Sequence, residues 1–219
     1  MPATPVPATP TPVPAPQLGP ARFSLFTVNP QFTKQGVSFA ISQPAIVQIR
    51  IVPAGRAEPV RTLNLGRQPA GEVKATWNGR NDAGQLVPEG SFSYVIHATG
   101  AAGGQDQASY HDLGITHKRI VVSLSQQRLT AYDDQQQFLT TLVTTGNQAL
   151  PTPVGTFPIL GKYQPFTFVS PWPKGSEFYY EPSPVNYALL FDNAGYYVHD
   201  SPWRSAYGPG RTRSWARRA

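Results

Sequence analysis

The sequence predicts an all-β protein with two folded units, and three observations indicate this fold class. Short apolar runs alternate with polar residues at a period of two, as in strands with one buried face. Turn-forming residues separate these runs, because the 219 residues include 24 prolines and 19 glycines. Hydrophobic residues make up 40% of the chain and charged residues 14%, so most of it can bury a core.

A proline-rich segment begins the chain. Residues 2–20 read PATPVPATPTPVPAPQLGP. Proline fixes φ and has no amide N–H, so this segment can form neither a helix nor a regular strand ladder. Residues 1–21 are predicted to be a disordered, extended spacer of polyproline type. We interpret the spacer as a tether; a ligand for a proline-reading domain is the alternative, but the segment lacks the flanking charges typical of such ligands.

Residues 22–100 are predicted to form the first folded unit. Apolar residues alternate with small ones over 37–41, which indicates a strand with one buried face. Further strands are expected over 46–52, 60–65 and 92–96. Asn-Gly, Asp-Ala-Gly and Pro-Glu-Gly turn signals precede the closing strand.

A motif in this unit reads TWNGRNDAGQLVPEGSFSYVIHATG. Its informative residues are Trp77, Asn78, Gly79, Asn81, Asp82, Gly84, Val87, Pro88, Gly90, Phe92 and Tyr94. The motif resembles the Ig-like domain of the flagellar hook-cap protein and of many secreted bacterial proteins. The resemblance implies an Ig-like β-sandwich in which Trp77 anchors the core. No chemistry is expected here, since His97 stands alone on its strand.

Residues 101–116 are predicted to be a linker. Gly103 and Gly104, followed by polar residues, suit a connection between domains. His111 and His117 suggest a metal site, but apart from Asp112 no acidic residue or cysteine completes a ligand set. No metal and no cofactor are therefore expected.

Residues 117–219 are predicted to form the second unit. Strands are expected over 120–124, 129–132 and 138–143, separated by Ser-Gln-Gln and Asp-Asp turns. Because consecutive short strands follow without helical periodicity, they predict a β-meander. The aromatic-rich run 166–191 either contributes core or covers a cleft.

Four short motifs occur in order along this unit. They are Ile120, Val122, Leu124, Gln127, Leu129 and Tyr132; Thr145-Gly146; Pro151, Thr152, Pro153, Gly155 and Phe157; and Gly195 to His199. In this order they resemble the catalytic domain of the L,D-transpeptidases, often called the YkuD domain. The resemblance implies an L,D-transpeptidase-type β-sandwich.

The resemblance also implies acyl transfer through a cysteine. In this family a thiolate attacks a carbonyl of the peptidoglycan stem peptide, and an imidazole moves the protons. The family motif is a histidine, a gap of roughly 14–17 residues, and Ser/Thr-His-Gly-Cys. His199 occupies the first position and is the implied general acid/base, with the backbone carbonyl of Asp200 orienting its ring. The alternative is a strand-end histidine that faces solvent.

The sequence departs from the family motif after Gly210. It contains no cysteine, so it holds no thiol nucleophile, no disulfide and no thiolate metal site. Ser214 is followed by Trp215 instead of His-Gly-Cys. We expect the tail RTRSWARRA to come from a shifted reading frame or a truncated gene, and the incomplete domain to expose part of its core.

The net charge of +6 does not indicate nucleic-acid binding. Four of the charges are the arginines of the last nine residues, which form a basic end without interleaved aromatics. No run approaches the roughly 20 apolar residues of a membrane span. No secretion signal is present at the start, so we expect any signal or anchor to lie upstream.

The expected function follows from the second resemblance. We expect a peptidoglycan L,D-transpeptidase family member of the cell envelope, inactive in this chain because the nucleophile is absent, with peptidoglycan stem peptides as its partner. The alternative is a non-catalytic envelope or peptidoglycan-binding module. A purely structural spacer is a third possibility.

Overall fold

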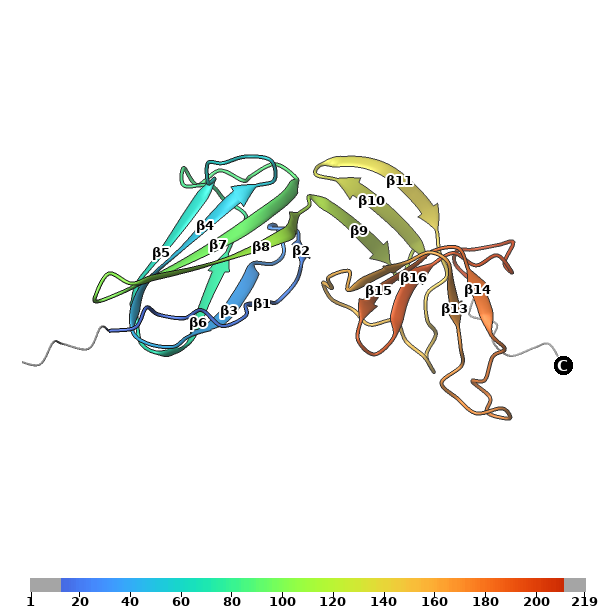
Figure 1. The fold of residues 1–219 in the computed structure, drawn as a ribbon. Coiled ribbons are helices and arrows are strands. Elements are labelled where there is room, and N and C mark those ends of the chain that lie inside the picture. Colours follow the sequence, from blue (N-terminus) through green and yellow to red (C-terminus); the bar gives the residue numbers. More distant parts are fainter. Residues whose placement is uncertain (1–12, 211–219) are drawn as a thin grey trace, which may run out of the picture. The chain divides into compact units, whose positions relative to one another are not determined.

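The computed structural model describes residues 13–210, and over this range the regular elements are all strands. This confirms the all-β prediction. The chain divides into two compact units, with the boundary between Thr116 and His117 (Figure 1). The tail RTRSWARRA and the first twelve residues of the predicted spacer lie outside the described residues.

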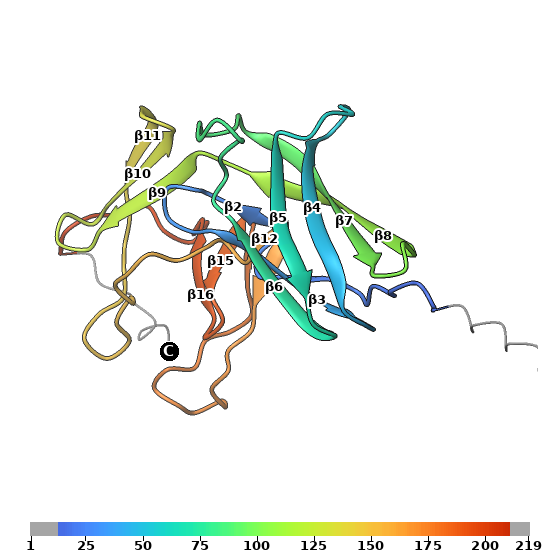
Figure 2. The ribbon, with the colours of Figure 1, turned by 90° about the vertical axis from the view of Figure 1, so that its left-hand side faces the viewer.

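The first unit is a sandwich of two sheets. Its strands are β1 (Arg22–Phe23), β2 (Thr27–Val28), β3 (Gln35–Ile41), β4 (Ala45–Pro53), β5 (Arg61–Gln68), β6 (Gly71–Trp77), β7 (Gly90–Gly100) and β8 (Gln105–Ile115). One sheet has the order β1-β3-β6 and the other β2-β8-β7-β4-β5 (Figures 1 and 2). The pairings are antiparallel except for the parallel pair of β2 and β8.

The core of this unit lies between its two sheets. The alternating apolar residues of β3, β4 and β7 point inward and are almost fully buried. Trp77 ends β6 and is 1% exposed, which confirms its prediction as a core anchor. Its ring centroid lies 5.3 Å from that of Phe92 and 6.2 Å from that of Tyr94, in edge-to-face geometry. Its indole N–H donates a hydrogen bond to the Arg80 carbonyl at 2.8 Å.

The linker predicted over 101–116 is instead mostly a strand. β8 pairs antiparallel with β7 along its length, and Leu113 and Ile115 belong to the buried core. The first half of β8 carries polar residues outward, while its inward row includes Asp106 and Tyr110, which are only half-buried. Because the two faces differ little in polarity there, the strand gave no clear alternating signal.

The end of the predicted spacer also differs from the prediction. Pro16 is buried against the first unit. The Leu18 N–H donates to the Asp106 carboxylate at 2.7 Å, and the Gly19 N–H donates to a backbone carbonyl of β3 at 2.9 Å. Proline becomes sparse at this point of the segment, so amide N–H groups become available for such hydrogen bonds.

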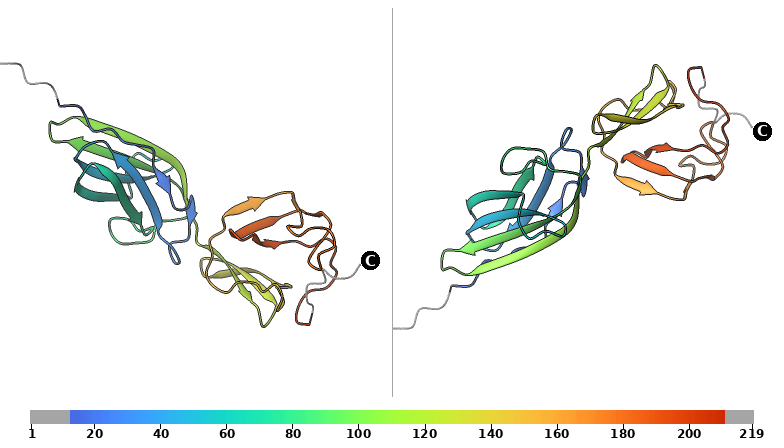
Figure 3. Two further views of the ribbon diagram at one scale, coloured as in Figure 1. Left: turned by 90° about the horizontal axis from the view of Figure 1, so that it is seen from below. Right: turned by 90° about the horizontal axis from the view of Figure 1, so that it is seen from above.

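The second unit contains three small sheets. Its strands are β9 (Lys118–Ser123), β10 (Arg128–Asp133), β11 (Gln136–Leu142), β12 (Gly161–Tyr163), β13 (Phe166–Phe168), β14 (Ser183–Val185), β15 (Ala188–Asp192) and β16 (Tyr196–His199). The predicted meander is present as the antiparallel sheet β11-β10-β9. It faces the sheet β12-β15-β16 across the unit, while β13 pairs with β14 (Figure 3).

Apolar side chains in this unit are less well covered than in the first. All seven residues of β11 are exposed, including Phe138 at 60% and Leu139 at 47%. Over residues 13–210, no helical segment has the length and hydropathy of a membrane span.

Candidate functional site

The hairpin of β15 and β16 positions His199. The hairpin turn is closed by a hydrogen bond from the Gly195 N–H to the Asp192 carbonyl at 3.0 Å, and Gly195 adopts a φ of +87°, which favours glycine. At the open end of the hairpin, His199 lies opposite Ala188 in register. The strand alternation places Tyr197 and His199 on the same face of the sheet.

The His199 ring is oriented by the backbone of the next residue. Its Nδ1 lies 2.6 Å from the Asp200 carbonyl oxygen. Because a carbonyl oxygen only accepts hydrogen bonds, Nδ1 carries the proton in this contact. A neutral ring in this tautomer has its lone pair at Nε2, where it can take a proton from an acidic group. The contact joins the two residues to which the family resemblance assigns roles, and those roles stay predictions.

Aromatic side chains surround the ring. The centroid of Phe168 lies 4.8 Å from that of His199, and Trp203 lies at 6.2 Å on the following segment. Phe166 stacks on Tyr197 with centroids 5.4 Å apart. Most of these rings are half-buried, so this part of the aromatic run packs around the imidazole without enclosing it. Burial, and then the proximity of Tyr163, raises the pKa of the Tyr197 hydroxyl.

The side chain of Asp200 holds the segment between β14 and β15. Its Oδ1 accepts the backbone N–H of Tyr187 at 2.8 Å and that of Asn186 at 2.9 Å, while its Oδ2 accepts the Asn186 side-chain amide at 2.8 Å. Sequence reasoning assigned a role only to the Asp200 carbonyl. No hairpin was predicted over residues 188–199, so there was no sequence-based reason to pair Asn186 with the Asp200 side chain.

These hydrogen bonds also determine the charge of the carboxyl group. Burial raises the pKa of Asp200, but the hydrogen bonds from Tyr187 and Asn186 to its ionised form outweigh that effect and leave the pKa below its ordinary value of 3.8. The carboxylate therefore stabilises the fold above that ordinary pKa. The stabilisation is lost as the pH falls through the lower folded-state pKa.

The first three sequence motifs of the unit meet around Gly146. The Gln127 side chain accepts the Thr145 N–H at 2.8 Å and donates to the Thr145 hydroxyl at 2.6 Å. The Gly146 N–H donates to the Thr152 hydroxyl at 2.8 Å. A Cβ on Gly146 would collide with the Leu150 carbonyl oxygen and lie 2.7 Å from the Thr152 nitrogen. The loop thus closes on a position that only glycine fits.

The segment after His199 is attached to the same region. The Arg204 guanidinium donates to the Thr144 hydroxyl at 2.8 Å, and the Gly208 N–H donates to the Val143 carbonyl at 3.1 Å. The segment that follows the fourth motif is thereby connected to the strand end that leads into the Thr145-Gly146 motif.

One of the two histidines considered as metal ligands, His111, contacts a serine of the neighbouring strand. The His111 Nδ1 lies 2.8 Å from the Ser93 hydroxyl. Within residues 13–210, no three side chains of the ligating types His, Cys, Asp and Glu gather closely enough to hold a metal ion.

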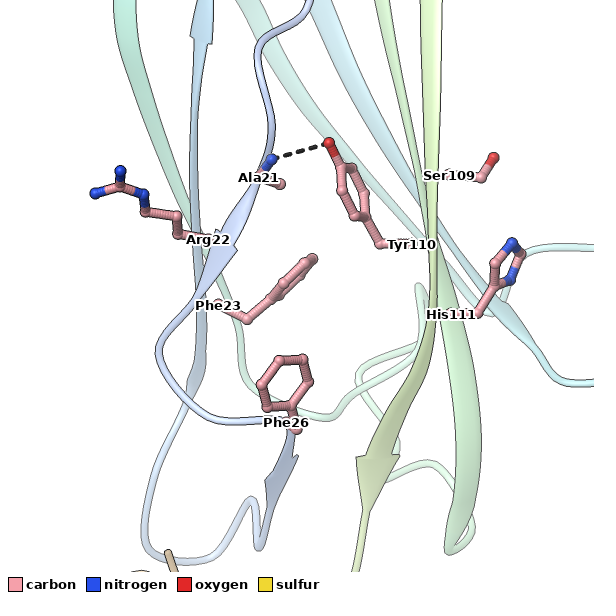
Figure 4. A pocket seen from close by; sticks show the side chains of 7 residues that line it. All are labelled: Ala21, Arg22, Phe23, Phe26, Ser109, Tyr110 and His111. Atoms are coloured by element: carbon pink, nitrogen blue, oxygen red, sulfur yellow. Dashed lines mark hydrogen bonds between the residues drawn. The ribbon is translucent and has the colours of Figure 1, made fainter.

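A shallow hollow of about 540 Å³ lies in the first unit, between β1 and β8 (Figure 4). Its floor is aromatic, with Phe23 packed edge-on against Tyr110 at 5.6 Å. Phe26 lies at its open side and is 69% exposed, while the Tyr110 hydroxyl accepts the Ala21 N–H at 2.9 Å. The hollow is the open edge of the sandwich, and it contains none of the transpeptidase-like motif residues.

Comparison with known protein families agrees with both resemblances. The family model of the L,D-transpeptidase catalytic domain matches residues 117–218, and that of the FlgD Ig-like domain matches residues 30–102. No curated protein sequence matches the chain.

Solved structures of both kinds are similar to parts of the chain. An L,D-transpeptidase of Enterococcus faecium is 33% identical, with a TM-score of 0.37, over 42% of this chain and 35% of that one. An L,D-transpeptidase of Mycobacterium smegmatis is 20% identical, with a TM-score of 0.47, over 88% and 82%. FlgD of P. aeruginosa is 19% identical, with a TM-score of 0.35, over 48% and 76%.

The chain thus spans only about a third of the Enterococcus faecium protein. The family matches cover most of both folded units. The second unit is therefore recognised as an L,D-transpeptidase catalytic domain of the YkuD type, and the first as an Ig-like domain of the FlgD type.

Proposed function

We propose that the second unit binds the stem peptides of peptidoglycan at the His199 site, and that this 219-residue polypeptide does not itself transfer an acyl group. The observation that carries the proposal is the hydrogen bond from the His199 Nδ1 to the Asp200 carbonyl at 2.6 Å. The segment that follows His199 is hydrogen-bonded to Thr144, next to the loop in which the first three sequence motifs meet. The proposed place of action is the cell envelope, where peptidoglycan lies.

The chemistry of the family defines what this chain supplies. In acyl transfer, the imidazole takes the proton of a thiol, the sulfur bonds to the stem carbonyl carbon, and the bond to the leaving amine breaks as that amine is protonated. An amine of a neighbouring stem then replaces the sulfur. His199 supplies the base for these proton transfers. The chain has no cysteine, so by itself it cannot supply the sulfur nucleophile of this reaction.

The fixed orientation of the His199 ring favours a binding role over a purely structural one. A domain that acted only as a spacer would not need the imidazole held in one tautomer, because the ring is not part of a buried core. The proposed module therefore retains the recognition half of the family's activity. Stem peptides are its proposed ligands.

The chain is expected to be retained by isolated peptidoglycan, and His199→Ala is expected to weaken the retention. Loss of one ring that contacts the ligand corresponds to roughly 1 kcal/mol, or about a fivefold weaker apparent affinity. The measurement is co-sedimentation of the full chain with purified sacculi over a range of sacculus concentrations.

The matched control for this experiment is His111→Ala, which removes an exposed histidine of the first unit. Its retention should equal that of the unchanged chain. If the unchanged chain is not retained, or if both variants bind equally well, the proposed function is wrong.

No covalent adduct is expected when the chain is incubated with a carbapenem. These β-lactams acylate the cysteine of L,D-transpeptidases, and this sequence has no thiol. Intact-protein mass spectrometry measures the result, with an active L,D-transpeptidase as the positive control. A mass increase equal to that of the carbapenem would show that another nucleophile of this chain is acylated.

A further inference from the structure

The open end of the β15–β16 hairpin is held by one side chain, that of Asp200. The strands end in the register pair Ala188 and His199, and the residues just outside that pair are Tyr187 and Asp200. The carboxylate accepts three N–H groups from Asn186 and Tyr187 at 2.8 to 2.9 Å. A carboxylate that accepts several N–H groups forms strong, charge-assisted hydrogen bonds.

The backbone of Asp200 is held to the same residue as its side chain. Its N–H points at the Tyr187 carbonyl at 3.4 Å, while the Tyr187 N–H donates to the carboxylate at 2.8 Å. The next residue is held as well, because the Ser201 carbonyl accepts the Arg204 N–H at 2.9 Å and the Tyr207 hydroxyl at 3.1 Å. The peptide group that carries the Asp200 carbonyl therefore lies between two fixed points.

We propose that the Asp200 carboxylate is a positioning residue, which fixes the backbone carbonyl that keeps His199 in its Nδ1–H tautomer. The carbonyl meets Nδ1 at 2.6 Å. The other nitrogen, Nε2, then carries the lone pair that a base needs. The role of this tautomer in binding stem peptides rests on the proposed function. The effect of the Asp200 carboxylate on the tautomer does not depend on that function.

The two aromatic side chains that pack on the ring do not select the tautomer in the same way. Phe168 and Trp203 pack against the imidazole and restrict its rotation. Neither offers a hydrogen-bond acceptor, since a phenyl ring has none and an indole N–H only donates. The Asp200 carbonyl is the acceptor that meets Nδ1, and the proposal is that the position of this carbonyl depends on the carboxylate.

The experiment is nitrogen-15 NMR of the full chain, in which the two ring nitrogens of neutral His199 report the tautomer directly. The unchanged chain is expected to show mainly the Nδ1–H form. Asp200→Ala is expected to shift the ring to mainly the Nε2–H form, which free neutral histidine prefers. The proposal is overturned if folded Asp200→Ala keeps the tautomer ratio of the unchanged chain.

The same hairpin provides a matched control. Asp192 lies at its other end, and its carboxylate accepts the Ala194 N–H at 2.8 Å in the turn. Asp192→Ala removes one carboxylate from the same hairpin and should leave the His199 tautomer unchanged. An equal shift in both variants would show general loosening of the hairpin and would contradict the proposal.

A milder variant keeps the experiment decisive if Asp200→Ala does not fold. Asn186→Ala removes only the side-chain donor to Oδ2 and should shift the tautomer ratio in the same direction by a smaller amount. If Asp200→Ala does not fold and Asn186→Ala leaves the tautomer ratio unchanged, the proposal is overturned. Retention on sacculi is measured separately, so failure of the binding proposal leaves the tautomer result unaffected.

Discussion

Trp77→Ala is expected to lower the free energy of unfolding of the first unit by about 3–5 kcal/mol, the range for removing a buried tryptophan. The ring is 1% exposed and packs edge-on against Phe92 and Tyr94. Its removal leaves a cavity between the two sheets and takes away the hydrogen-bond donor to the Arg80 carbonyl. A loss of this size is a large share of the stability of a single domain.

Urea unfolding combined with hydrogen exchange of the peptides from β3 to β7 measures this loss in the first unit. Trp203→Ala is the matched control, because Trp203 is 48% exposed and lies in the second unit. It should leave the exchange of those peptides unchanged. Equal protection of β3 to β7 in Trp77→Ala and in the unchanged chain would contradict the role of Trp77 as the core anchor.

The sequence predicted those strands whose core-facing side chains are mostly apolar. β4 and β7 carry apolar residues along their inward rows, and so does β3 after Gln35 at its start, so their period of two is clear. β8 was missed because its inward row contains Asp106 and Tyr110, each with a polar partner in the tertiary structure. Those partners lie 88 and 89 residues away, so local pattern could not reveal them.

The contacts of the candidate site also fall into those that the sequence could predict and those that it could not. His199 and the Asp200 carbonyl are adjacent in the sequence, so the family motif could imply their contact. The hydrogen bonds of the Asp200 carboxylate span 13 and 14 residues, and they form only when the β15–β16 hairpin has its observed register. The bridge from Gln127 to Thr145 spans 18 residues and likewise requires the folded meander. Spacing alone does not determine such register-dependent contacts.

Gly146→Ala is expected to weaken retention on sacculi by about tenfold or more, which corresponds to about 1.4 kcal/mol. The added methyl group would overlap the Leu150 carbonyl oxygen and lie 2.7 Å from the Thr152 nitrogen and 2.9 Å from the Pro151 carbonyl carbon. All three are backbone atoms, so no side chain can rotate away. The loop must move as a whole, which breaks the hydrogen bond from Gly146 to Thr152.

The control for this variant is Gly175→Ala in the same unit. Gly175 adopts a φ of +98°, but no heavy atom lies within 4 Å of the Cβ position, so the substitution introduces backbone strain without a collision. That strain corresponds to about 1–2 kcal/mol. Hydrogen exchange should therefore increase over residues 144–157 in Gly146→Ala and not in Gly175→Ala. Because the loop joins three of the four motifs, equal retention of both variants on sacculi would show that stem peptides do not depend on it, and the binding site would then have to lie elsewhere on the domain.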